Sequence, residues 1–129
     1  MTPKRTAAAG PRAAVVGSGS WGTTFGKILA DGGAQVTMWA RRPELAQEIN
    51  EAKRNSRYLP GINLPRTMAA THELATALDG VDQVYLSVPS QSLRENLKAL
   101  RPLLADSDAK IISLMKGVER GTGLRMSQV

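Results

Sequence analysis

A glycine-rich hexapeptide near the start of the chain restricts the fold more than any other feature of the sequence. Residues 17–22 read Gly-Ser-Gly-Ser-Trp-Gly and directly follow the apolar run at residues 13–16. This order predicts a buried strand that enters a tight turn, and a helix that begins at the turn. Gly17 permits the sharp turn, Gly19 has no side chain to keep a ligand from the backbone, and Gly22 lets the helix pack near the strand.

The same turn is a predicted anion site. The free N–H groups in the first turn of the helix, together with the helix dipole, favour phosphate groups. We therefore expect Gly17, Gly19 and Gly22, with Ser20 and Trp21 between them, to bind a dinucleotide cofactor. A plain glycine turn without a ligand is the alternative, and the strand before the turn and the helix after it favour the cofactor.

The rest of the chain alternates between predicted strands and helices. Short apolar runs predict the strands, and apolar residues at i, i+3 and i+4 predict the helices. This alternation predicts an α/β fold with a doubly wound, mostly parallel, Rossmann-like sheet in the strand order 3-2-1-4-5. Pro102 is expected to kink or break the helix that precedes the last strand. The predicted strands are residues 12–16, 35–39, 66–70, 83–88 and 110–114.

The sequence predicts one folded domain with an extension before it. Residues 1–11 are mostly Thr, Pro, Lys, Arg and Ala, which indicates a disordered N-terminal extension. Residues 12–129 are long enough for a single NAD(P)-binding domain. Residues 115–129 follow the last predicted strand without a closing element, so we expect the domain to be incomplete at its C-terminal end.

Composition argues against several classes of function. The formal net charge is +6, but the aromatic residues are only two Trp, two Tyr and one Phe, widely separated. Because no base-stacking surface or recognition motif accompanies the charge, we expect no nucleic-acid partner. No apolar run approaches the ~18 residues of a membrane span, and no signal peptide is recognised, so a cytoplasmic location is expected. With no Cys and one His, no disulfide and no metal site are expected.

Two arginines follow the second predicted strand, where such a sheet binds the adenosine ribose of its cofactor. A cofactor without a 2′-phosphate is usually held there by an acidic residue, but the chain has Arg41 and Arg42. Guanidinium groups bind phosphate oxygens in pairs, which favours NADP over NAD. An arginine that simply points into water is the alternative, and Arg41 is the stronger candidate of the two.

Four further residues have both a functional and a structural interpretation. Ser20 offers a phosphate its hydroxyl and N–H together, whereas Trp21 offers mainly its N–H and its ring is equally suited to packing. Tyr58 lies in an irregular loop and either covers the nicotinamide end or anchors the loop to the core. Lys116 follows the fifth predicted strand, where it either reaches a ligand or is an ordinary solvated lysine.

Five motifs occur in an order that is similar to one known family. They are Gly-Ser-Gly-Ser-Trp-Gly-Thr (17–23), Trp-Ala-Arg-Arg (39–42), Asn-Ser-Arg-Tyr-Leu-Pro-Gly (55–61), Val-Pro-Ser-Gln (88–91) and Met-Lys-Gly-Val-Glu (115–119). Together they resemble the N-terminal domain of the bacterial NAD(P)-dependent glycerol-3-phosphate dehydrogenase, over residues 12–129.

The resemblance implies an oxidoreductase that reversibly reduces dihydroxyacetone phosphate to sn-glycerol 3-phosphate with NADPH or NADH, for glycerophospholipid biosynthesis. It implies cofactor contacts for Ser20, Trp21, Arg41, Arg42 and Tyr58, and contacts of Lys116 with both cofactor and substrate. It also implies a small-molecule substrate and a homodimer in the full-length enzyme.

Members of the family are more than twice as long as this chain. In them, an all-helical C-terminal domain supplies the acid/base lysine and most contacts to the substrate phosphate, so no catalytic residue is expected in this chain. The chain is then the cofactor-binding part of a dehydrogenase, inactive alone and with apolar surface exposed. The alternatives are a stand-alone, non-catalytic NADP-binding module, or a related reductase of another small keto or hydroxy acid.

Overall fold

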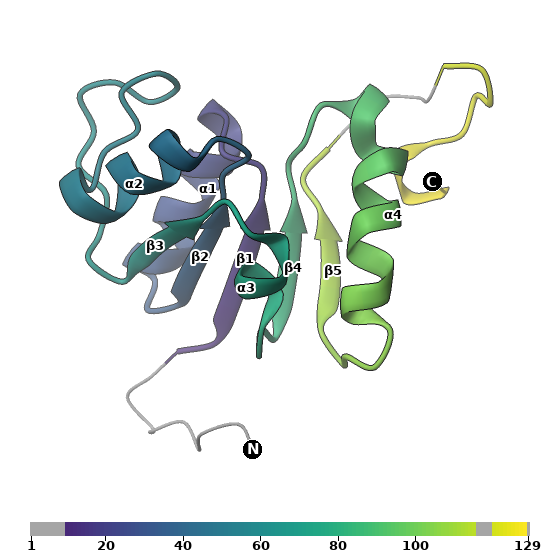
Figure 1. Ribbon diagram of the computed structural model, residues 1–129, viewed down its shortest axis with the longest axis horizontal. Coiled ribbons are helices and arrows are strands. Elements are labelled where there is room, and N and C mark those ends of the chain that lie inside the picture. Colours follow the sequence, from purple (N-terminus) through teal and green to yellow (C-terminus); the bar gives the residue numbers. More distant parts are fainter. Residues whose placement is uncertain (1–9, 116–119, 129) are drawn as a thin grey trace.

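The computed structural model describes residues 10–115 and 120–128. Their strands form one parallel sheet with the order β3-β2-β1-β4-β5 (Figure 1). The strands are β1 (Arg12–Val16), β2 (Gln35–Trp39), β3 (Met68–Thr71), β4 (Gln83–Leu86) and β5 (Lys110–Ser113). The predicted doubly wound, Rossmann-like fold and its strand order are therefore confirmed.

Helices cover both faces of the sheet. In Figure 1, α1 lies behind the strands and α3 in front of them. Two core clusters follow this division: one joins the sheet to α1 and α2, and the other joins it to α3 and α4. The helices are α1 (Ser20–Asp31), α2 (Pro43–Ala52), α3 (Leu74–Leu78) and α4 (Leu93–Leu104), with short 3-10 turns η1 (Ser90–Ser92) and η2 (Met126–Gln128).

Strand β1 is the centre of both cores. Ala13 and Val15 belong to the cluster on the α1 and α2 side, whereas Ala14 and Val16 belong to the cluster on the other side. Each of these four residues is at most 1% exposed. Because successive side chains of a strand point to opposite faces, a central parallel strand must be apolar throughout. This requirement explains why the run before the glycine turn does not alternate with polar residues.

Three of the five predicted strands have other bounds in the structure, and so does the helix that contains Pro102. The predicted strands 66–70, 83–88 and 110–114 are Met68–Thr71, Gln83–Leu86 and Lys110–Ser113. The third strand begins at Met68 instead of residue 66, because Met68 N donates to Pro65 O (3.1 Å) and the intervening residues form a turn. Of the kink or break expected at Pro102, the break is wrong, since α4 continues through Pro102 to Leu104. Pro102 lies in the last turn, where its missing N–H removes one bond from a helix that is about to end.

The residues from 53 to 64, which follow α2, form a closed loop. Leu64 N donates to Lys53 O (2.7 Å) at its base, and Leu59 N donates to Asn55 O (2.8 Å) inside it. Helix α2 holds the loop from outside through Glu48. The Glu48 carboxylate accepts from Ser56 Oγ (2.5 Å) and from Ser56 N (3.1 Å).

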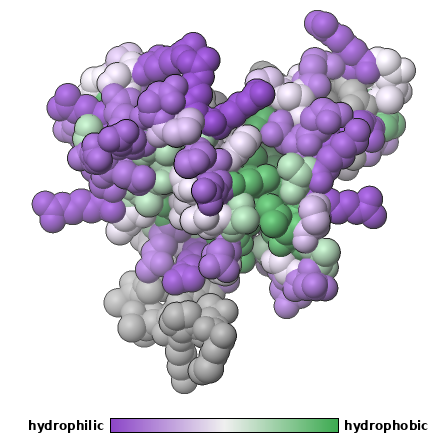
Figure 2. Space-filling view, in the orientation of Figure 1, coloured by the Kyte–Doolittle hydropathy of each residue, from purple (hydrophilic) through white to green (hydrophobic). Residues whose placement is uncertain are grey.

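An apolar groove lies on the face of the sheet that carries α4. Figure 2 shows apolar residues gathered between α3 and α4 in this view. The groove has a volume of about 350 Å³, and Ile111 of β5 is 54% exposed beside it. It is lined by Val84, Leu86, Leu97, Leu100, Arg101, Leu104, Ala105 and Ile111.

Residues 1–9 of the predicted extension lie outside the described residues. At its end, Pro11 O accepts a hydrogen bond from Gln35 N (2.9 Å), next to β2. Within residues 10–115 and 120–128, no helix has the length and apolar character needed to cross a membrane. Nor does this part of the chain bring three or more His, Cys, Asp or Glu residues together as metal ligands.

We expect Gly17→Ala to destabilise the fold by about 2 kcal/mol or more. Gly17 has φ +121°, and a Cβ placed on it would lie 2.1 Å from Ser87 O. Because this oxygen belongs to the backbone, it cannot move aside as a flexible side chain could. Gly61→Ala is the control, because Gly61 has φ +77° but no atom within 4 Å of such a Cβ, so only strain of about 1 kcal/mol is expected. Urea unfolding measures both, and equal losses would contradict the close contact with Ser87.

Glu48 should make stability depend on pH below neutrality. The hydrogen bonds from the Ser56 side chain and backbone, with the Arg54 charge, hold the pKa of this carboxyl below 4.5 despite some desolvation. A lowered pKa stabilises the folded state above the unfolded pKa, and the contribution is lost as the pH falls through the folded pKa. Glu48→Gln should therefore be less stable than the parent at pH 7, and this difference should shrink as the pH falls through the folded pKa; Ser56→Ala should show the same trend. A difference in unfolding free energy that does not change with pH would refute this assignment.

Candidate functional site

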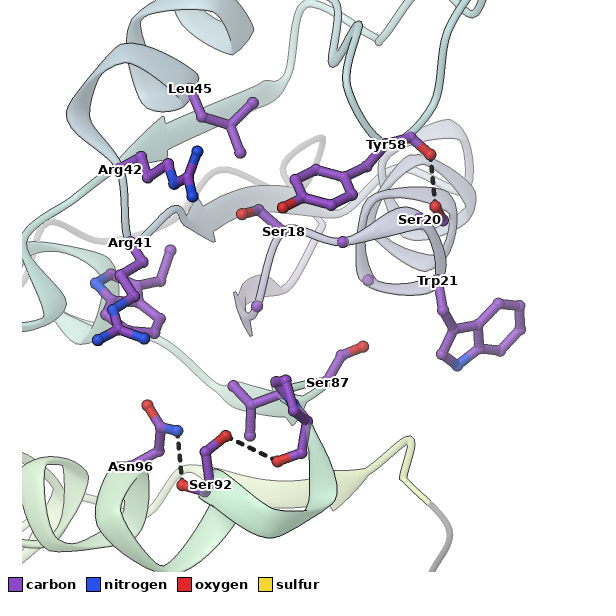
Figure 3. A pocket seen from close by; sticks show the side chains of 16 residues that line it. Ser18, Ser20, Trp21, Arg41, Arg42, Leu45, Tyr58, Ser87, Ser92 and Asn96 are labelled. Carbon is purple, nitrogen blue, oxygen red and sulfur yellow. Dashed lines mark hydrogen bonds between the residues drawn. The ribbon is translucent and has the colours of Figure 1, made fainter.

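A cleft opens at the edge of the sheet where β1, β2 and β4 end. Its volume is about 530 Å³, within the range of ligand pockets, and Figure 3 shows the side chains around it. It lies where the strand order reverses between β1 and β4, which is the binding position in doubly wound sheets. The lining residues come from the glycine turn, the end of β2, the start of α2, the loop after α2, the end of β4, η1 and the start of α4.

The glycine turn forms the floor of the cleft. Helix α1 begins at Ser20 with Gly19 as its N-cap, and neither a side-chain cap nor an acidic residue occupies its first turn. A Cβ placed on Gly19 would meet no atom within 4 Å, whereas one on Gly22 would lie 2.6 Å from Gly17 O. Open space in front of uncapped N–H groups at a helix N-terminus suits an anion.

Ser20 and Trp21 differ in what they offer a ligand. Ser20 Oγ donates to Tyr58 O (2.6 Å), so its hydroxyl proton is used within the protein and its backbone N–H remains for a ligand. Trp21 is 54% exposed, and its ring lies tilted against Phe25 with 6.0 Å between the ring centroids and points away from the two arginines in Figure 3. Trp21 can therefore reach the cleft by its backbone better than by its ring.

Arg41 and Arg42 give the cleft its charge. Both follow β2, line the cleft and are exposed. Neither guanidinium group has a hydrogen bond or ion pair with any residue in the described part of the chain. The lining set within residues 10–115 contains no Asp or Glu, so this end of the cleft is positively charged and favours an anionic ligand.

Tyr58 lies across the cleft from the arginines and is held by its backbone. Its ring is half-buried, with the Arg57 guanidinium 5.3 Å from the ring centroid. Its carbonyl accepts from Ser20, and its N–H donates to Asn55 Oδ1 (3.3 Å). The loop after α2 is thus bonded directly to the start of α1.

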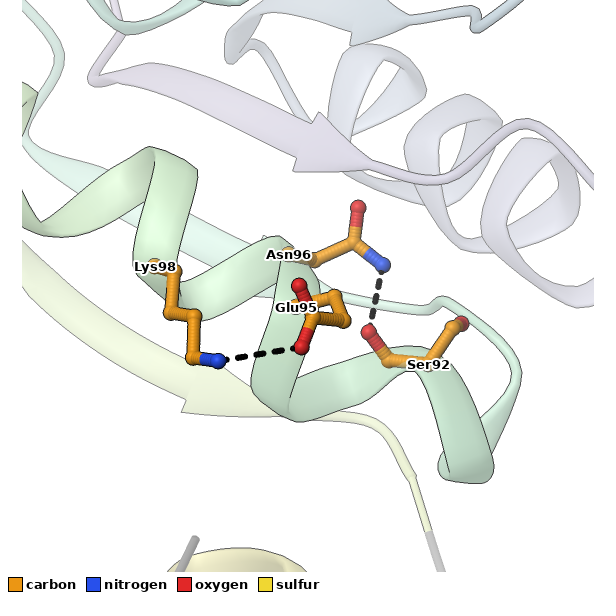
Figure 4. Close-up of polar contacts among 4 residues, drawn as sticks. All are labelled: Ser92, Glu95, Asn96 and Lys98. Atoms are coloured by element: carbon orange, nitrogen blue, oxygen red, sulfur yellow. Dashed lines mark hydrogen bonds and ion pairs between the residues drawn. The ribbon is translucent and has the colours of Figure 1, made fainter.

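The start of α4 forms the opposite wall. Ser92 Oγ donates to Pro89 O (2.8 Å), and Asn96 Nδ2 donates to Ser92 O (2.8 Å). Figure 4 shows the Asn96 amide beside Ser92, to whose carbonyl it donates. Lys98 forms an ion pair with Glu95 (3.1 Å) on the exposed surface of the helix. Asn96 and Ser92 therefore present polar side chains to the cleft.

Eight of the nine predicted cofactor residues line this one cleft: Gly17, Gly19, Ser20, Trp21, Gly22, Arg41, Arg42 and Tyr58. Lys116, the ninth and the predicted substrate contact, lies outside the described residues. The sequence-based set omitted Ser87, Ser92 and Asn96, which lie at the end of β4, in η1 and in α4. For Ser87, the position just after a buried strand was a usable signal. The set also omitted Asn55, which lies behind the turn within the Asn-Ser-Arg-Tyr motif.

Comparison with known proteins gives one consistent result. The family described as "NAD-dependent glycerol-3-phosphate dehydrogenase N-terminus" matches residues 12–129. Glycerol-3-phosphate dehydrogenase (NAD(P)+) of Leifsonia xyli is 64% identical over 115 residues, which are 89% of this chain and 31% of that protein. The protein of the same name from Nocardia farcinica is 56% identical over 122 residues, 92% of this chain and 36% of that protein.

A solved structure agrees with the sequence matches. The crystal structure of glycerol-3-phosphate dehydrogenase from Coxiella burnetii has a TM-score of 0.83 and 31% identity, over 92% of this chain and 36% of that one. The chain thus spans about a third of the length of these relatives. From the family match and these identities, the chain belongs to the family of NAD-dependent glycerol-3-phosphate dehydrogenase N-terminal domains.

Proposed function

We propose that this chain supplies the dinucleotide-binding part of an NAD(P)-dependent glycerol-3-phosphate dehydrogenase, which reversibly reduces dihydroxyacetone phosphate to sn-glycerol 3-phosphate. The observation that carries the proposal is the cleft, in which an uncapped helix N-terminus and two arginines without partners among residues 10–115 and 120–128 lie at opposite ends of one binding surface. A dinucleotide has phosphates at corresponding places, in its diphosphate and, for NADP, on the adenosine ribose.

The residues present fit the cofactor. Gly19, with open space at its Cβ position, and the N–H groups of Ser20 and Trp21 would hold the diphosphate, while Gly17 and Gly22 shape the turn. Arg41 would bind the 2′-phosphate with support from Arg42, so we propose NADP as the preferred cofactor over NAD. Tyr58 would cover the nicotinamide end.

When bound, the cofactor supplies the hydride. The chain's own contribution is to bind and orient, because a hydride transfer needs the two reactants aligned. From the family resemblance, Lys116 would contact both cofactor and substrate, where its charge favours the developing alkoxide. We propose that the acid/base lysine belongs to the part of the relatives that this chain does not match, and that the enzyme is a cytoplasmic homodimer in glycerophospholipid biosynthesis.

Calorimetric titration with NADPH and NADH tests the proposal directly, with a dihydroxyacetone phosphate reduction assay on the same sample. Binding of NADPH without turnover is expected. Binding without turnover even when the matching C-terminal part of a relative is supplied would favour the alternative, a non-catalytic NADP-binding module. A folded chain that binds neither nucleotide would refute the proposed function.

Arg41→Ala should separate the two cofactors. Loss of a charge-assisted contact to the 2′-phosphate should weaken NADPH binding by about tenfold or more, whereas NADH binding should change by less than about threefold. Arg42→Ala is the matched control and should have a smaller effect on NADPH. Similar losses for NADPH and NADH in the Arg41 variant, measured by calorimetry, would remove the 2′-phosphate contact from the proposal.

Gly19→Ala should separate binding from stability. Gly19 has φ −73° and no neighbour within 4 Å of an added Cβ, so the unfolding free energy should change by less than about 0.5 kcal/mol. The added methyl group would occupy the space in front of the turn, so NADPH binding should weaken by at least about tenfold. Unchanged affinity in a variant of normal stability would show that the diphosphate does not lie against Gly19.

A further inference from the structure

Asn55 is a buried polar residue directly behind the glycine turn. It is 0% exposed, and the neighbouring Thr23 is also 0% exposed. Asn55 Nδ2 donates to Ser18 O (2.9 Å) and to Thr23 Oγ1 (2.9 Å), while Oδ1 accepts from Tyr58 N (3.3 Å). Both amide N–H bonds are therefore used, and the amide orientation is fixed because the Ser18 carbonyl can only accept.

These contacts set the direction of one peptide group in the turn. The Ser18 carbonyl accepts a second hydrogen bond from Thr23 Oγ1 (3.2 Å), so two donors hold it toward the protein interior. Every described peptide bond is trans, and in a trans peptide the N–H points opposite to the C=O. The Gly19 N–H must therefore point away from Asn55.

The same side chain also fixes the loop that carries Tyr58. Through Oδ1 it holds the Tyr58 N–H, and the Asn55 carbonyl accepts from Leu59 N (2.8 Å). Ser20 Oγ also donates to Tyr58 O (2.6 Å). The turn and the loop are therefore joined by two separate contacts, one from Asn55 and one from Ser20. Asn55 thus connects the floor of the cleft to the residue above it, across 37 positions of sequence.

We infer that Asn55 is a positioning residue for the cofactor diphosphate. It orients the Ser18–Gly19 peptide, and with it the N–H groups that follow, before any ligand arrives, and it holds Tyr58 in place by the same amide. Preorganised donors bind an anion more tightly because no reorientation accompanies binding. This inference rests on the proposed dinucleotide function, and it assigns Asn55 no contact with the cofactor itself.

The test uses two ligands that differ at the diphosphate. 2′-Phospho-ADP-ribose carries the diphosphate and the 2′-phosphate, whereas adenosine 2′-monophosphate carries only the phosphate that Arg41 would bind. In Asn55→Ala, the affinity for 2′-phospho-ADP-ribose should fall by about tenfold or more, and the affinity for adenosine 2′-monophosphate should stay within about twofold. Calorimetry measures the first ligand and NMR titration the weaker second one.

Three further variants separate positioning from folding. Thr23→Val keeps the side-chain shape but removes the hydroxyl that bonds to Asn55 and Ser18, so it should show the same selective loss at several-fold, and Thr23→Ser should restore the affinity. Asn50→Ala is the control. Asn50 lies in α2 and makes two hydrogen bonds of 2.8 Å with the Ala70 backbone, and it does not line the cleft. This variant should leave both affinities unchanged. Thermal melting shows which variants are folded, and the Thr23 pair decides if Asn55→Ala does not fold.

The outcomes distinguish this inference from the proposed function. A parent chain that is folded but binds neither ligand would refute the proposed function. A parent that binds both, with folded variants that lose neither ligand or lose both equally, would refute the positioning by Asn55 and leave the proposed function intact.

Discussion

The contact between the glycine turn and the end of β4 governs the arrangement of the whole carboxyl edge. Ser87 N donates to Val16 O (2.9 Å), which continues the pairing of β1 with β4 beyond the last residue of β4. The next residue along, Gly17, passes so close to Ser87 O that no side chain fits. Because the two backbones meet here, α1 and α4 leave the sheet on opposite faces from neighbouring points, and the cleft is the space that remains between them.

Binding chemistry in this cleft comes almost entirely from backbone and from two charges. The floor offers uncapped N–H groups and the β2 end offers guanidinium groups without partners in the described residues. Neither element is part of the packed core, since β1 buries Ala13 to Val16 on both faces. The centre of the sheet can therefore be apolar while its carboxyl edge presents N–H and guanidinium groups of the kind that suit phosphate groups, a division of tasks that parallel sheets permit.

Much of this structure could be predicted from the sequence because its signals are local. The glycine turn, each strand and the arginines after β2 follow from short patterns whose physical meaning does not depend on distant residues, and the strand order follows from the alternation of these elements. Contacts that join separate elements had no such signal: Gly26 of α1 lies against Met38 and Met68, two side chains from different strands. The hydrogen bond of Asn55 to Ser18 could not be predicted for the same reason, because only the folded chain brings these two residues together. The break predicted at Pro102 was wrong because the prediction used only the residue type. The loss of helix stability that a proline causes also depends on its distance from the end of the helix.

The long sequence separation within the Asn55 contacts has a consequence for the order of folding. The hydrogen bonds from Asn55 to Ser18 and Thr23 close loops of 37 and 32 residues, which contain β2 and α2. Closing such loops costs chain entropy that only the intervening packing can offset. We therefore expect the glycine turn to reach its final shape only after β1 and β2 have paired.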